Sequence, residues 1–132
     1  MKEEYVSYEQ SQALKRLGFA EPCDTFYNSH LQLCRYSDSD VINRNTNGHH
    51  TPSCSAPRLD QAQKWLREVK GVEIVVEPRF CNYKRIGYDW HVYDDCSNDY
   101  ALRAPLPFSE TYELALSDGI SGALELLTNN TK

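Results

Sequence analysis

The side chains best suited to acid–base chemistry in this 132-residue sequence belong to two stretches of alternating apolar and polar residues. Glu73 and Glu77 are in the first stretch, and Asp89, His91 and Tyr93 are in the second. Alternate residues of a strand point to the same face, so pairing of the two stretches would gather all five side chains on one face of a hairpin. A carboxylate beside a histidine holds the imidazole proton and tunes its pKa, which is the chemistry of a general acid or base.

Two interpretations of this face stay open. A small enzyme would use His91 together with Asp89 or Glu73. Alternatively, the face is simply solvated or serves as a polar partner interface, because antiparallel sheets commonly expose one face to water. We favour the second interpretation and predict no catalytic residue; His91, Asp89 and Glu73 are the candidates if the first one holds.

The segment 80–88 is a second candidate site, because it interleaves Lys84 and Arg85 with Tyr83 and Tyr88. Aromatic rings stack on bases and cations contact phosphates, so this segment could bind single-stranded nucleic acid weakly. The whole chain, however, has 14 Lys and Arg against 19 Asp and Glu, a net charge of −5. A nucleic-acid or anionic-membrane binder needs a cationic field, so we expect neither partner. As binding residues we take Tyr83, Lys84, Arg85 and Tyr93, with an ordinary hairpin tip as the alternative.

The cysteines and glycines do not match the usual cofactor or metal motifs. Five cysteines occur at irregular spacings without a C-x-x-C pair, which favours free thiols. Cys34, His49, His50 and Cys54 are the one set with a possible metal spacing, and we do not favour it because zinc ligands usually form tighter pairs. The common phosphate-loop, dinucleotide and hydrolase motifs are missing. We predict no metal and no cofactor.

The N-terminus and the hydropathy favour the cytoplasm. No apolar run approaches the 18 residues of a membrane span. The first five residues are polar and acidic, unlike a signal peptide. We therefore expect a cytoplasmic protein with reduced thiols and no membrane association.

Periodicity and capping residues predict the elements that would position these side chains. In chain order they are a helix from Ser7 to Gly18, a hairpin over 23–36, a polar and mobile loop over 37–55, a helix from Pro57 to Gly71, a strand from Val72 that weakens at Pro78, a loop over 81–85, a strand over 86–94, and a helix with Ser109 as N-cap. The order α-β-β-α-β-β-α predicts one α+β domain over residues 1–132. We expect a single antiparallel four-stranded sheet with the amphipathic helices packed on one face.

The apolar positions indicate which sides of these elements form the core. The side chains predicted to face the helices are Val72, Ile74, Val76, Tyr88, Trp90 and Val92, and the helix stripes are Leu59, Ala62, Leu66 and Val69 in the second helix and Tyr112, Leu116, Ile120, Ala123, Leu124 and Leu127 in the third. The His91 side of the second hairpin would then be exposed to solvent. Gly119 and Gly122 are costly inside a helix, which suggests close backbone packing or a break.

Three segments of the chain carry a resemblance to a known group of proteins. They are residues 4–8 at the start of the first helix, residues 56–69 around the second, and residues 109–115 at the start of the third. Together they resemble small uncharacterised proteins of gut anaerobic bacteria, their phages and integrated elements. The resemblance implies an accessory protein of phage or mobile-element origin, and it implies no activity and no site residues.

Charge and resemblance together favour a non-enzymatic interaction or regulatory protein. An acidic, tyrosine-bearing sheet face would bind another protein, either a host factor or a second copy of the chain. The small enzyme and the single-strand binder remain as alternatives.

Overall fold

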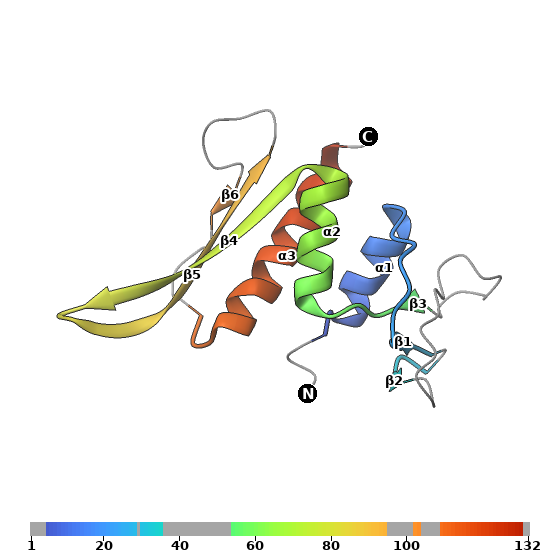
Figure 1. Cartoon of the computed structure of the whole chain (residues 1–132), viewed down its shortest axis with the longest axis horizontal. Coiled ribbons are helices and arrows are strands. Elements are labelled where there is room, and N and C mark those ends of the chain that lie inside the picture. Colours follow the sequence, from blue (N-terminus) through green and yellow to red (C-terminus); the bar gives the residue numbers. More distant parts are fainter. Residues whose placement is uncertain (1–4, 29, 36–53, 95–101, 104–108, 131–132) are drawn as a thin grey trace. The chain divides into compact units, whose positions relative to one another are not determined.

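Two structural units, Met1–Arg58 and Leu59–Lys132, make up the chain, and each is described by itself (Figure 1). The computed structural model describes residues 5–28, 30–35, 54–94, 102–103 and 109–130. Both units combine helix with antiparallel sheet, which confirms the α+β class. None of the helices in the described part of the chain is long and apolar enough to cross a membrane.

The first unit begins with α1, Tyr8–Arg16, whose ends are those that the sequence predicts. The Ser7 hydroxyl accepts a hydrogen bond from the Gln10 amide, and the Ser7 amide donates to the Gln10 side chain at 2.8 Å. This capping box satisfies two amide groups that a helix start otherwise leaves unpaired. Gly18 follows the helix with a φ of +98°, a conformation that glycine adopts without strain.

The sheet of the first unit has the order β2-β1-β3, with β1 at Thr25–Tyr27, β2 at Leu33–Arg35 and β3 at Cys54–Ser55. The hairpin expected over 23–36 is therefore present. The polar loop was expected to reach Ser55, and that boundary is wrong, because Cys54 and Ser55 pair with β1 and are fully buried. A strand of two residues shows no alternation that a sequence could reveal. Residues 37–53 of that loop lie outside the described residues.

In the second unit α2 spans Leu59–Lys70, and its core stripe is rotated slightly from the predicted one. Leu59, Ala62 and Leu66 are buried as expected, but Trp65 is buried as well, while Val69 is 58 % exposed. Because Trp65 is much larger than Val69, turning the helix toward the indole removes more apolar surface from water.

The last helix, α3, spans Tyr112–Asn130 and starts two residues later than expected. Ser109 was predicted as the N-cap, but it forms an isolated β-bridge with Tyr88 instead. The Thr111 hydroxyl accepts a hydrogen bond from the Leu114 amide, which is the bond of an N-cap residue. The later start also leaves Tyr112, expected in the core stripe, 43 % exposed.

Close packing at Gly119 joins α3 to the sheet of this unit. A Cβ atom added there would lie 2.7 Å from Cγ2 of Ile74, which is closer than two non-bonded carbon atoms approach each other. The helix backbone therefore rests directly on Ile74 and Trp90, so close packing rather than a break explains the glycine at position 119. Of the six strand side chains predicted to face the helices, Val72, Ile74, Trp90 and Val92 are buried, whereas Val76 and Tyr88 are half-buried.

The second sheet has the order β4-β5-β6, with β4 at Val72–Cys81, β5 at Lys84–Asp94 and β6 at Leu102–Arg103. The two sheets are separate, so the prediction of one four-stranded sheet is wrong. Alternation along a sequence predicts that strands exist, but the pairing partners depend on contacts between distant residues. Here β1 pairs with β2 and β3, and β5 pairs with β4 and β6.

The β4–β5 hairpin is longer than predicted, since the strand continues through Pro78 and the loop expected over 81–85 is reduced to the two turn residues Asn82 and Tyr83. Tyr88 exchanges both backbone hydrogen bonds with Ser109, so its amide and carbonyl point away from β4. Pro78 is directly opposite Tyr88, and in an antiparallel ladder its amide position then points away from β5. The proline therefore costs the hairpin no ladder hydrogen bond and lies on the outer edge of β4.

Candidate functional site

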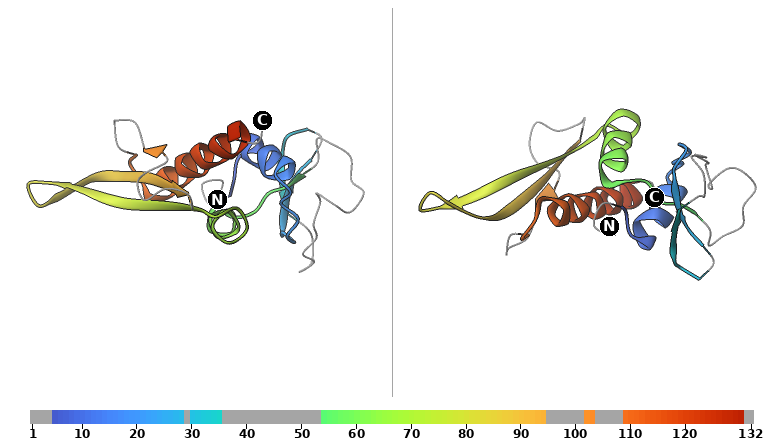
Figure 2. Two further views of the ribbon diagram at one scale, coloured as in Figure 1. Left: turned by 90° about the horizontal axis from the view of Figure 1, so that it is seen from above. Right: turned by 60° about the horizontal axis from the view of Figure 1, so that its bottom comes forward.

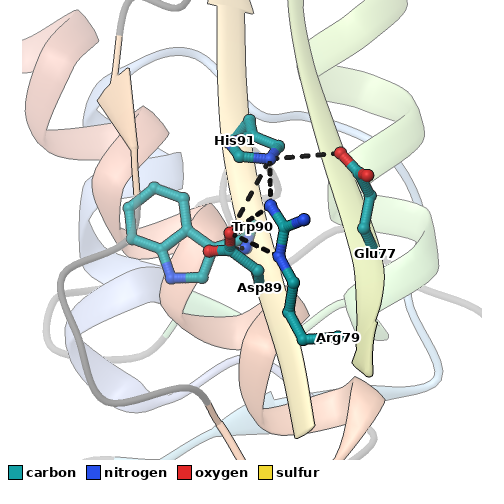
Figure 3. A network of polar contacts seen from close by, with 5 residues as sticks. All are labelled: Glu77, Arg79, Asp89, Trp90 and His91. Carbon is teal, nitrogen blue, oxygen red and sulfur yellow. Dashed lines mark hydrogen bonds and ion pairs between the residues drawn. The ribbon is translucent and has the colours of Figure 1, made fainter. Parts of the chain in front are cut away.

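Four charged or titratable side chains form a network on the face of the hairpin that points away from α3 (Figure 3). Glu77 and Arg79 come from β4, and Asp89 and His91 come from β5. Arg79 donates to Oδ2 of Asp89 from Nε at 3.1 Å and from Nη2 at 2.7 Å. Nε2 of His91 lies 3.1 Å from Oε1 of Glu77, 3.8 Å from Oδ2 of Asp89 and 3.5 Å from Nη2 of Arg79.

The strand register explains why these partners are diagonal. Glu77 is directly opposite Asp89, an arrangement that places two carboxylates face to face. Like charges in opposite positions destabilise a strand pair. Arg79 and His91 lie one step away on either side, and each contacts the carboxylate on the other strand. The network therefore joins the two strands and offsets the carboxylate repulsion.

His91 is only 1 % exposed, so the expectation that this face of the hairpin is exposed to solvent is wrong at His91, although the side chains of Glu73 and Glu77 on the same face are 44 and 45 % exposed. Asp89 is buried too, so β5 has buried side chains on both faces at residues 89–92. A strand covered on both sides shows little alternation of burial, and the sequence pattern cannot reveal the second cover. A general acid or base must touch its substrate, so the burial of His91 counts against this candidate.

Of the three acid–base candidates, His91 and Asp89 lie within 3.8 Å of each other, whereas Glu73 lies apart from them. Glu73 is opposite Tyr93 and forms an ion pair with Arg67 at 3.5 Å, while Glu77 is the carboxylate that reaches the imidazole. Sequence reasoning missed Arg79, although its position two residues after Glu77 would have placed it on the same face of a strand continued through Pro78. The contacts of His91 therefore connect β5 to β4.

The turn end of the hairpin is the second candidate site, and it extends beyond the start of α3 (Figure 1, Figure 2). We call residues 80–86 the hairpin tip. The tip presents three large apolar side chains to solvent, namely Phe80, Tyr83 and Ile86, which are 62, 105 and 52 % exposed. Lys84 and Arg85 are exposed beside them. Exposed apolar groups that gather in one place are typical of an interaction site.

A β-bulge shapes this tip. Arg79 pairs with Gly87 and Phe80 pairs with Arg85, so Ile86 is an extra residue on β5. Bulges bend a strand, increase its twist and redirect side chains. Here the bulge leaves Ile86 half exposed.

The base of the tip is held by contacts to the start of α3. The Tyr88 ring packs edge-on against the Tyr112 ring, with 5.9 Å between centroids, and the Tyr88 backbone bonds to Ser109. The Arg85 guanidinium lies 5.4 Å from the Tyr88 ring centroid, within the range of a cation–π contact. These contacts and the charge network fix both faces of the hairpin below its tip.

Of the four predicted binding residues, Tyr83, Lys84 and Arg85 lie together at the tip. Tyr93 is half-buried at the opposite end of β5, opposite Glu73, so it does not belong to the same surface. Phe80 and Ile86 were not predicted, because the sequence placed them at the borders of a loop. An apolar residue at each border of a polar turn is the signal that could have revealed them.

The four described cysteines are free thiols of unlike exposure: Cys81 is exposed at the tip, Cys34 is half-buried, and Cys23 and Cys54 are buried. Burial raises the pKa of the Cys54 thiol from 9.0 to about 11, although nearby Lys15 opposes the shift. Among the described residues no three His, Cys, Asp or Glu side chains are grouped as a metal site would require. His49 and His50 lie outside the described residues, so the metal set that includes them is not tested.

Comparisons with protein families, curated proteins and solved structures found no match. The resemblance to small proteins of gut bacteria and their phages thus stays a prediction.

Proposed function

We propose that this protein is a non-enzymatic binding protein that engages another protein through the tip of its β4–β5 hairpin. The observation that carries the proposal is the exposure of Phe80, Tyr83 and Ile86 together at the end of a projecting hairpin. Large apolar and aromatic side chains supply most of the binding energy where they enter a partner's pocket. If a partner buried these three side chains, apolar surface that the chain alone leaves exposed would be removed from water.

The support beneath the tip favours binding. The Arg79–Asp89 and Glu77–His91 contacts join the strands on one face, and the Tyr88–Tyr112 contact holds the other. A surface that is ordered before binding loses less conformational entropy in the complex. The proposed binding surface replaces the acidic, tyrosine-bearing sheet face that the sequence suggested, since His91 and Asp89 on that face are buried.

The biological setting of the proposal is that of a regulatory accessory protein. An accessory protein of a phage or an integrated element would act by binding and blocking a host factor, and a second copy of the chain is the other candidate partner. The small-enzyme alternative loses its support with the burial of His91.

The experiment compares capture by the intact protein and by two variants. Phe80→Ser/Ile86→Ser removes two tip side chains, and Val69→Ser removes an exposed apolar side chain on α2 as the matched control. We expect the immobilised wild type and V69S to capture the same protein from host lysate, and the tip variant to lose it while keeping the same circular dichroism spectrum. Equal capture by the tip variant contradicts the proposal, and so does a strict monomer that captures nothing.

Single-stranded nucleic acid is the second candidate partner, favoured by the stacking of Arg85 on Tyr88 next to exposed Lys84. Binding of a labelled twenty-nucleotide oligo(dT) would weaken with salt, since phosphate contacts release counterions. Fluorescence anisotropy at low salt tests this candidate, and an unchanged signal removes it.

A further inference from the structure

The turn of the β4–β5 hairpin contains an aromatic residue where the backbone favours glycine. Cys81 pairs with Lys84, so Asn82 and Tyr83 are the two turn residues. Both have positive φ, 52° for Asn82 and 65° for Tyr83, as in a type I′ turn. Asparagine tolerates this conformation well, whereas a bulky residue is strained in it. Asn-Gly is the pair that such turns favour, and this chain has tyrosine at the glycine position.

The Tyr83 side chain gives the protein no packing in return for this strain, since it is fully exposed. Its phenol ring extends from the end of the hairpin, while the apolar core of the same unit lies at the other end, around Ile74 and Trp90. Strained backbone that persists without local compensation is typical of functional positions. A residue that lowers stability and makes no packing contact within its own fold is expected to contact another molecule.

We infer that Tyr83 is the anchor residue of the hairpin tip, and that its partner is a protein with an apolar pocket bordered by carboxylates. The inference rests on the proposed function and adds to it the residue that enters the pocket and the chemistry that receives it. Tyrosine suits such a role because it offers a large apolar ring with a polar end and loses little side-chain entropy.

The charge of the hairpin tip indicates which groups border the partner's pocket. The tip contains Lys84 and Arg85 and no acidic residue, while the charge of nearby Arg79 is paired with Asp89. Subtracting the two tip charges from the net charge of −5 leaves −7 on the rest of the chain. Carboxylates around the pocket would therefore attract the tip and be repelled by the remainder of the molecule, which selects this end for docking.

The same charges argue against nucleic acid as the partner. A polyanion that extends beyond the tip meets the repulsion of the acidic remainder, and the tip offers two cations. Phe80 and Ile86 flank Tyr83, and the aliphatic Ile86 has no π-face on which a base could stack. A pocket in a protein accommodates all three side chains.

The first test of the anchor needs no partner. Tyr83→Gly should relieve the backbone strain, so hydrogen exchange at the Cys81 and Lys84 amides should slow by roughly two- to fivefold. Tyr83→Phe keeps the ring and the strain and should exchange like the wild type. Exchange in Y83G that is unchanged or faster overturns the inference that the tyrosine is held at a conformational cost.

The second test identifies what Tyr83 touches. A benzophenone amino acid at position 83 should cross-link, in host lysate, to a protein segment with apolar residues flanked by Asp or Glu, whereas the same group at position 69 should not. Capture of that protein should be lost in Y83G, retained in Y83F and weakened by salt. The absence of a cross-link from position 83 overturns the inference.

Three defined probes cover the other occupants of the tip. They are labelled oligo(dT), vesicles of phosphatidylcholine with phosphatidylglycerol, and the protein itself in sedimentation. Saturable binding of any one that is lost in Y83G overturns the choice of partner. If Y83G retains partner capture while the Phe80→Ser/Ile86→Ser variant loses it, the anchor is wrong and the proposed function stands; if both variants retain capture, both are wrong.

Discussion

Glu77 and Asp89 lie directly opposite each other on the two strands of the β4–β5 hairpin, and each is contacted by a basic side chain of the other strand. Asp89 accepts hydrogen bonds from Arg79, and Glu77 contacts the buried His91. The arrangement stiffens the hairpin below its exposed tip. Function is then expected at the tip, and the titratable groups below it serve as its support.

Removal of Arg79 should destabilise the protein. Arg79→Ala leaves the buried Asp89 carboxylate without two hydrogen bonds and facing Glu77. A buried charge deprived of its partner lowers the free energy of unfolding by about 1–3 kcal/mol. Because Arg79 is partly exposed, we expect a loss toward the lower end of this range. Urea unfolding followed by tryptophan fluorescence measures the difference.

A matched variant and a double variant separate this effect from the loss of any arginine. Arg67→Ala breaks the exposed pair with Glu73 and should cost less than about 0.5 kcal/mol. Asp89→Asn in the R79A background removes the uncompensated carboxylate and should recover part of the stability. Equal losses of unfolding free energy in R79A and R67A would show that the charge network around Asp89 does not stabilise the hairpin.

Gly119→Ala should destabilise the protein although alanine is the better helix former. In an open helix the change stabilises by about 1 kcal/mol. Here the new Cβ would lie 2.7 Å from Cγ2 of Ile74, so the helix must move away from the sheet. Overpacking of this kind costs about 1–3 kcal/mol. Thermal unfolding gives the sign, and a stabilised G119A variant would mean that α3 does not rest on Ile74.

Cys54 should be unreactive in the folded protein near neutral pH. Burial raises the pKa of its thiol to about 11 from 9.0, so the thiolate that alkylating reagents require is scarce. Because the folded state raises this pKa, the stability that the thiol contributes is complete below pH 9 and is lost as the pH rises through 11. Iodoacetamide labelling with peptide mapping should modify the exposed Cys81 first, and rapid labelling of Cys54 at pH 8 would disprove its burial.

Pro78 should matter more for association than for stability. Pro78→Thr restores an amide that points away from β5, so the ladder keeps all its hydrogen bonds and stability should change by less than about 1 kcal/mol. The outer edge of β4 then gains a donor for pairing with another chain, and sedimentation velocity should show more self-association. A loss well above 2 kcal/mol would instead mean that Pro78 faces β5.

The features that sequence predicts correctly are those fixed by neighbouring residues. The capping box of Ser7 and Gln10 and the end of α1 at Gly18 depend on residues within one helical turn. The buried set of Val72, Ile74 and Trp90 follows from alternation along single strands. Local features of this kind can be recognised from the order of neighbouring residues.

The features that sequence misses depend on distant partners. Cys54–Ser55 becomes a strand only because β1 is there to pair with it, and His91 is buried because both faces of β5 are covered. Pro78 suggested a weakened strand end, yet its effect depends on which way its amide position faces, and the pairing of Tyr88 with Ser109 decides that. The site was therefore predicted in part: the tip cations and Tyr83 were found, and Phe80 and Ile86 were not.

Partner affinity measured at the hairpin tip tests the proposed function most directly. With the captured protein in hand, biolayer interferometry gives its dissociation constant for the wild type, for Phe80→Ser/Ile86→Ser and for Val69→Ser. We predict at least a tenfold weaker affinity for the tip variant, since two anchoring side chains are lost, and no change for V69S. An unchanged affinity of the folded tip variant would contradict the assignment of the hairpin as the binding element.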